Sequence, residues 1–149
     1  MSPLAVGEAA PAIGGISFDD GPVALFFYKV TCPTCQLAAP TMATFERVAP
    51  GRAIGVGQDP VAELDRFSAT FSIGIGSVED PPPYATSDAY EVVSVPTLYL
   101  VDRGVVVDVV GAWDRDGFNR VAAGIARSVG AEPVPVSTPD DGRPAFKPG

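Results

Sequence analysis

The sequence contains no histidine, and only two of its 149 residues are cysteines. The lack of histidine excludes Ser-His-Asp and Cys-His nucleophilic sites, histidine metal ligands and an imidazole acid or base. A structural zinc ion takes four ligands, so two thiolates from one chain would need a dimer or carboxylate help. We therefore expect neither a metal nor another cofactor.

Positive charge and long apolar runs are also scarce. The chain has 10 basic and 18 acidic residues, a formal net charge of −8, and no basic cluster. This balance argues against a nucleic-acid partner. The longest tight apolar run covers residues 23–28, whereas a membrane span needs about 20 residues. No basic residue precedes Lys29, so the N-terminal region lacks the charged start of a secretory signal. We predict a cytoplasmic protein that binds neither nucleic acid nor membrane.

The composition indicates one globular domain followed by a tail. Hydrophobic residues make up 46% of the chain and charged residues 19%, which is typical of a single soluble domain. Residues 131–149 differ, because five of these 19 residues are proline and few are apolar. We predict a domain over residues 1–130 and a disordered, proline-rich tail over residues 131–149.

The first half of the chain alternates strands with helices. The continuous apolar run 23–28 predicts a strand buried on both faces, and residues 36–48 carry apolar side chains at helical spacing. Pro40 would kink that helix. A second strand over residues 52–57 and a second helix beginning near Pro60 follow, which implies a parallel strand pair with a right-handed crossover.

The second half predicts a hairpin and a final helix. Apolar runs at 97–101 and 105–110 flank a short turn that contains a glycine, which is the pattern of an antiparallel hairpin. Residues 113–129 keep a helical period of apolar side chains, and Asp114 or Asp116 would cap this helix. Together the elements indicate an α/β fold.

The two cysteines form the motif Cys32-Pro33-Thr34-Cys35, directly between the first strand and the first helix. At a helix start, unpaired backbone N–H groups and the helix dipole favour the Cys32 thiolate and lower its pKa. Cys35, one turn later, would resolve a mixed disulfide formed at Cys32. The alternatives are two neighbouring core cysteines or a structural disulfide, although so small a loop would stabilise the fold little.

With this motif, Pro40 and the segment Val95-Pro96-Thr97, residues 6–129 resemble the thioredoxin-like superfamily. Within it, the resemblance is to the branch of thioredoxin-like reductases and alkyl hydroperoxide reductase type proteins. It implies a thioredoxin fold, in which helices cover both faces of a central mixed sheet. It also implies that Pro96 is cis beside the cysteines, and that the substrate-binding residues are Val95, Pro96, Pro33 and Thr34.

The activity that the resemblance implies is thiol-disulfide exchange at Cys32 and Cys35. The partner would be a protein or small molecule that contains a disulfide, and an external thiol reductase would reset the pair. The residues between the cysteines leave the net direction open, because related motifs span reduction potentials from about −270 to about −120 mV.

Several positions depart from the pattern of the superfamily. Thr31 replaces the tryptophan that commonly precedes the first cysteine, and Phe26 replaces the buried acid of thioredoxins. No carboxylate is therefore placed by sequence to accept the proton of Cys35. Lys29 either favours the Cys32 thiolate electrostatically or extends to solvent from the strand end. 

Two further charges, Glu79 and Asp80, precede three consecutive prolines that predict a loop. They either approach the cysteine site or remain solvated in the loop. We interpret both as solvated loop charges.

Two other functions remain as alternatives. A peroxiredoxin-like peroxidase shares the fold, but its pattern of threonine or serine and proline before the reactive cysteine is replaced here by Lys29 and Leu25. A non-catalytic binding module would present the edge around Pro96, or the proline-rich tail, to a partner. The tail lacks a clear P-x-x-P frame with aromatic or basic neighbours.

Overall fold

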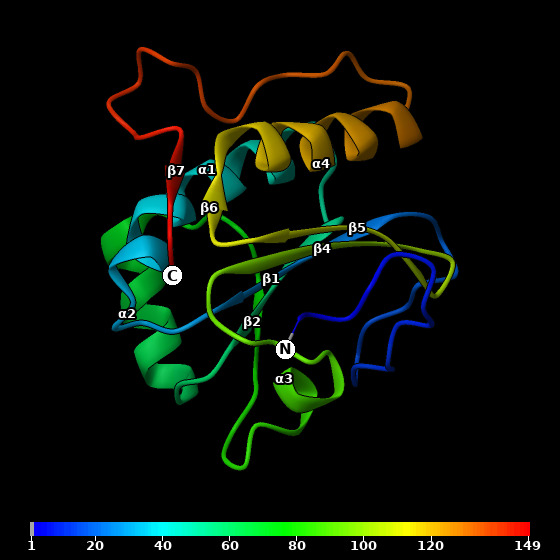
Figure 1. The fold of residues 1–149 in the computed structure, drawn as a ribbon, viewed down its shortest axis with the longest axis vertical. Coiled ribbons are helices and arrows are strands. Elements are labelled where there is room, and N and C mark those ends of the chain that lie inside the picture. Colours follow the sequence, from blue (N-terminus) through cyan, green and yellow to red (C-terminus); the bar gives the residue numbers. More distant parts are fainter. Residues whose placement is uncertain (1) are drawn as a thin grey trace.

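A five-stranded mixed sheet forms the centre of the computed structural model, which describes residues 2–149 (Figure 1). The strands lie in the order β3-β2-β1-β4-β5. Their bounds are β1 Val23–Tyr28, β2 Ala53–Gly57, β3 Ser77–Glu79, β4 Thr97–Asp102 and β5 Val105–Gly111. Strands β1, β2 and β3 are parallel, whereas β4 runs antiparallel to both β1 and β5. The predicted parallel pair and hairpin are therefore confirmed.

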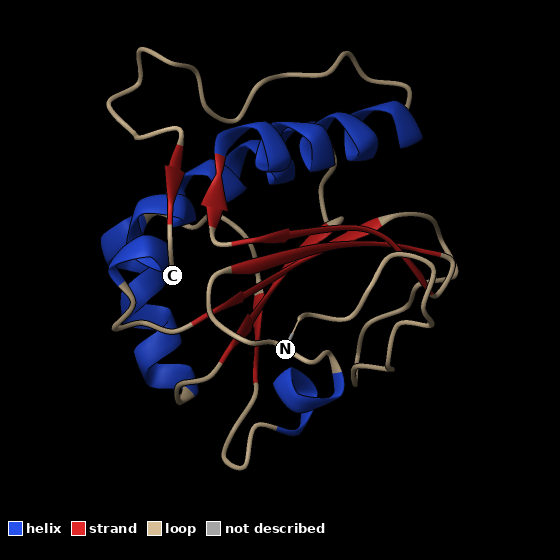
Figure 2. Cartoon of the chain, viewed as in Figure 1, coloured by secondary structure: helices blue, strands red, loops and turns tan. Residues whose placement is uncertain are grey.

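Within residues 2–149, four helices and two short strands complete the fold (Figure 2). The helices are α1 Pro33–Val48, α2 Val61–Phe71, α3 Ala85–Ala89 and α4 Arg115–Ser128, and the short strands β6 Trp113–Asp114 and β7 Phe146–Lys147 pair with each other. Asp114 caps α4 as predicted, because its side chain accepts a hydrogen bond from the Gly117 N–H at 3.3 Å. No helix within residues 2–149 is long and apolar enough to cross a membrane.

The central strand β1 divides the core into two clusters, because alternate side chains point to opposite faces of the sheet. Phe26 and Tyr28 pack with residues of α1, α2 and α4 on one face. Leu25 and Phe27 lie on the other face, with the N-terminal segment and with Tyr90 at the end of α3. Helices thus cover both faces as expected, but the three longer ones share one face. The N-terminal segment covers much of the other.

The irregular segment 72–87 contains β3 and the start of α3, two elements that the sequence did not predict. Asp80 explains why α3 forms, since its carboxylate accepts hydrogen bonds from the first-turn N–H groups of Thr86 and Ser87 at 3.0 and 2.8 Å. Asp80 is only 2% exposed, so its interpretation as a solvated loop charge is wrong. Glu79 is exposed, as interpreted, but it ends strand β3, where it pairs with Gly57, and does not lie in a loop.

Residues 131–149, which the sequence predicts to be disordered, lie against the domain in the structure (Figure 1). The contacts are mostly polar. Asn119 of α4 accepts hydrogen bonds from the backbone N–H groups of Val136 and Ser137 and donates one to the Ser137 carbonyl. Val136 also joins the core cluster beneath α4. Composition alone gave no sign of the Asn119 hydrogen bonds, because they use the backbone of the tail.

Candidate functional site

The cysteine motif lies where β1 ends and α1 begins. Cys32 is the N-cap of α1, and its sulfur accepts a hydrogen bond from the Cys35 backbone N–H at 3.1 Å. The preceding loop is held by Gln36, whose side-chain amide donates to the Val30 carbonyl at 2.9 Å. Both cysteines are free thiols in this structure; Cys32 is half-buried and Cys35 is fully buried. The sulfur that can meet a partner is therefore that of Cys32.

The environment separates the acidities of the two thiols. A hydrogen bond from the Cys35 side chain, aided by backbone N–H groups of the first helical turn, lowers the pKa of Cys32 from 9.0 to about 6. Burial raises the pKa of Cys35 far above its ordinary value, and the hydrogen bond to Cys32 adds to this effect. Near neutral pH, Cys32 is thus mostly a thiolate and Cys35 remains a thiol.

The loop before β4 brings Val95 and Pro96 to the cysteine pair. The Val95–Pro96 peptide bond is cis, which confirms the prediction, and a second cis bond joins Pro82 to Pro83. The Val95 carbonyl oxygen lies 3.5 Å from the Cys32 sulfur, which is within hydrogen-bond distance of the thiol. The structure therefore brings together Cys32, Cys35, Val95 and Pro96, as expected from the resemblance.

The remaining predicted site residues occupy different environments. Pro33 is exposed at the first position of α1, whereas Thr34 is only 2% exposed and donates a hydrogen bond to the Pro148 carbonyl at 2.6 Å. The Lys29 carbonyl accepts a hydrogen bond from the Cys32 N–H at 3.3 Å. An electrostatic role for the Lys29 ammonium stays a prediction.

Lys147 is the positive charge that helps to lower the pKa of Cys32. Lys147 could not be assigned to the site from the sequence, because it lies more than 100 positions from Cys32 within the proline-rich tail. Phe26, which stands where thioredoxins carry an acid, is fully buried among aromatic rings. No carboxylate is among the main influences on the pKa of Cys35.

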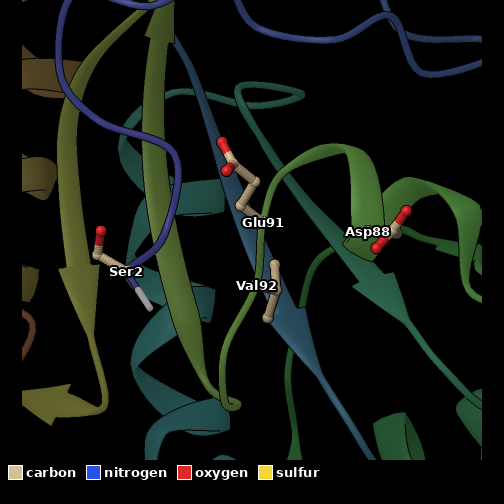
Figure 3. A pocket seen from close by; sticks show the side chains of 4 residues that line it. All are labelled: Ser2, Asp88, Glu91 and Val92. Atoms are coloured by element: carbon tan, nitrogen blue, oxygen red, sulfur yellow. The ribbon is translucent and has the colours of Figure 1, made fainter.

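A surface hollow beside α3 is lined by Ser2, Asp88, Glu91 and Val92, and by neither cysteine (Figure 3). The hollow therefore contains two acidic side chains but not the thiols of the candidate site. Within residues 2–149, no group of three or more cysteine, aspartate or glutamate side chains is arranged to hold a metal ion.

Neither a protein-family model nor a curated protein sequence matches the chain. Solved structures do. A putative thiol:disulfide interchange protein DsbE from Chlorobium tepidum is 21% identical, with a TM-score of 0.72 over 85% of this chain and 99% of that chain. DsbF from MTB is 26% identical, with a TM-score of 0.60 over 70% of this chain and 80% of that chain.

A third neighbour is a secreted Mycobacterium tuberculosis disulfide oxidoreductase that is described as homologous to E. coli DsbE. It is 21% identical, with a TM-score of 0.59 over 71% of this chain and 84% of that chain. These neighbours share the mixed sheet with its flanking helices. The chain has the thioredoxin fold.

Proposed function

We propose that this protein is a thiol-disulfide oxidoreductase that acts through Cys32 and Cys35. One observation carries the proposal: Cys32 caps α1 with its sulfur on the Cys35 N–H, while Cys35 is buried one helical turn behind it. This arrangement stabilises a nucleophilic thiolate and keeps a second thiol ready beside it. The resemblance of the fold to solved thiol-disulfide oxidoreductases supports the same function.

The reaction proceeds in two exchanges. The Cys32 thiolate attacks one sulfur of a partner disulfide, so that a mixed disulfide forms and the other partner sulfur leaves as a thiolate. Cys35 then loses its proton and attacks the Cys32 sulfur, which releases the second partner thiol and closes a Cys32–Cys35 disulfide. Two electrons pass from the cysteine pair to the partner, and an external thiol reductase returns them. In the reverse direction, the same pair oxidises a dithiol.

Val95 and Thr34 flank Cys32 and are the positions at which a partner would make polar contacts. The Val95 carbonyl is 3.5 Å from the Cys32 sulfur. The Thr34 hydroxyl follows Cys32 by two residues and is directed toward the same tail segment that approaches Val95. A partner disulfide in a protein or a small molecule would meet both groups as it reached Cys32.

The test is reduction of insulin disulfides with dithiothreitol as the external reductant, together with the equilibrium of the Cys32–Cys35 couple against glutathione. We expect the wild-type protein to accelerate insulin reduction and the Cys32→Ser variant to lose this activity while keeping its fold. A wild-type protein that neither accelerates insulin reduction nor exchanges with glutathione would contradict the proposal. The measured potential would also decide the net direction.

A cytoplasmic location stays a prediction from the sequence. One solved neighbour is described as secreted, so a location outside the cytoplasm is the alternative for this chain. Fractionation of cells that express the full-length natural gene product, followed by detection with an antibody, would decide it.

A further inference from the structure

The segment 143–149, which we call the C-terminal strap, runs back across the domain to the cysteine site. Figure 1 shows it in red, with β7 beside β6 and its last residues near the start of α1. Trp113 and Arg115 hold its first part. The Trp113 indole N–H donates to the Pro144 carbonyl at 2.8 Å, and the Arg115 backbone N–H donates to the Ala145 carbonyl at 2.9 Å.

Two further contacts fix the strap to the domain. The Arg115 guanidinium donates to the Arg143 carbonyl at 2.6 Å, and Arg115 itself is a buried side chain. The Arg143 Nε in turn donates to the Leu37 carbonyl of α1 at 3.1 Å. The strap is therefore tied both to the start of α4 and to the first half of α1.

The last residues of the strap use the polar groups that flank Cys32. Thr34, inside the cysteine motif, donates its hydroxyl to the Pro148 carbonyl. Gly149 lies so close to the Val95 carbonyl that a Cβ atom added to Gly149 would collide with that oxygen. Lys147 is near enough to favour the Cys32 thiolate. The strap thus occupies the surface on both sides of the reactive sulfur.

We propose that the C-terminal strap is an intramolecular occupant of the partner-binding surface, which a polypeptide partner must displace to reach Cys32. This inference rests on the proposed function, because it concerns access of a partner disulfide to that sulfur. The strap is an extended segment that pairs with β6, so the partner that replaces it best is another extended polypeptide. A small reagent needs less of this surface, and its access depends less on the strap.

The strap can be loosened by one substitution. Gly149→Ala adds a Cβ that collides with a backbone oxygen, so the end of the strap must move away from Val95. The change leaves Lys147 and the core untouched. Gly14→Ala is the matched control, because Gly14 is exposed and an added Cβ there meets no atom within 4 Å. A chain that ends at Ala145 is a second variant, and it keeps the contacts of Trp113 and Arg115 to the strap.

The experiment compares two reagents that carry the same reactive group. All proteins carry Cys35→Ser, so that Cys32 is the only thiol. Each is treated with N-ethylmaleimide and with an extended peptide that bears a maleimide. In both reactions the Cys32 thiolate adds to the maleimide double bond, a C–S bond forms and the neighbouring carbon takes up a proton. The ratio of the two rates isolates access for a polypeptide, because thiolate content and intrinsic reactivity cancel.

We expect the ratio of the peptide rate to the N-ethylmaleimide rate to rise about five-fold in Gly149→Ala, and at least as much in the shortened chain. A rise of this size corresponds to a modest shift from molecules with the strap bound at the cysteine site to molecules with the strap detached. The Gly14→Ala control should match the ratio of the parent protein, which carries Cys35→Ser alone. Ratios that agree within about two-fold across all four proteins would overturn the strap proposal. The outcome does not depend on disulfide exchange, so a failure of the proposed function in the insulin assay remains a separate result.

Discussion

The pKa of Cys32 should depend on which side chain stands at position 35. The largest influence that lowers this pKa to about 6 is the hydrogen bond from the Cys35 side chain. Cys35→Ala removes that donor and keeps the backbone N–H, whereas Cys35→Ser replaces the S–H by an O–H donor. The two variants therefore differ in one hydrogen bond to the thiolate.

A hydrogen bond to a charged group contributes about 1.5 to 3 kcal/mol, and one pKa unit corresponds to about 1.4 kcal/mol. Cys35→Ala should therefore raise the pKa of Cys32 by about one to two units. At pH 7 the thiolate fraction would fall from about nine tenths to between about one half and one tenth. Cys35→Ser should stay within about half a unit of the wild-type pKa.

The assay is the rate of alkylation of Cys32 by iodoacetamide as a function of pH, with thiolate absorbance as a second measure. The rate rises with pH, because only the thiolate reacts, and its midpoint gives the pKa. Wild-type protein should reach its midpoint near pH 6. Equal midpoints for Cys35→Ala and Cys35→Ser would refute the reasoning, since the side-chain donor would then have no effect on Cys32.

Three further predictions concern other parts of the molecule. Lys147→Gln should shift the alkylation midpoint of Cys32 upward by less than Cys35→Ala does, because the lysine is a lesser influence on that pKa. Asp80→Ala should lower the free energy of unfolding, measured by urea titration, by about 2 kcal/mol, because it leaves the first-turn N–H groups of α3 without acceptors. The control is Glu79→Ala at the exposed neighbouring position, which should change the free energy of unfolding by less than about 0.5 kcal/mol. The reduced protein should consume peroxide slowly in a peroxidase assay; rapid turnover would favour the peroxiredoxin-like alternative instead.

The parts of the fold that the sequence predicts well are those with a local signal. The apolar run at 23–28 specifies the buried strand β1, and the hairpin β4–β5 follows from two apolar runs around a short turn. Asp114 lies at the start of an amphipathic pattern, so the cap of α4 could be anticipated. The cysteine motif and the cis bond at Pro96 were also expected, the latter from the resemblance to the superfamily.

The parts that the sequence did not predict depend on contacts between distant residues. The short helix α3 begins where it does because Asp80, five residues before it, accepts its first N–H groups. The C-terminal strap is held by Arg115 and Trp113 through its backbone carbonyls. Because every residue has a backbone carbonyl, these contacts leave no pattern in the sequence. A buried arginine such as Arg115 has no mark in the sequence that separates it from a solvated one. The effect of Lys147 on the pKa of Cys32 could not be predicted from the sequence either, because it depends on the proximity of two residues that are distant in the chain.

Trp113 is the only tryptophan in the chain, it is fully buried, and its indole N–H is bonded to the Pro144 carbonyl of the C-terminal strap. The protein therefore carries its own optical probe at the base of the strap. Detachment of the whole strap would break the hydrogen bond of the indole N–H and shift the wavelength of tryptophan fluorescence emission. Loosening of the last residues alone would leave this hydrogen bond in place. Intrinsic tryptophan fluorescence could then distinguish detachment of the whole strap from displacement of its last residues alone, without any label on the protein.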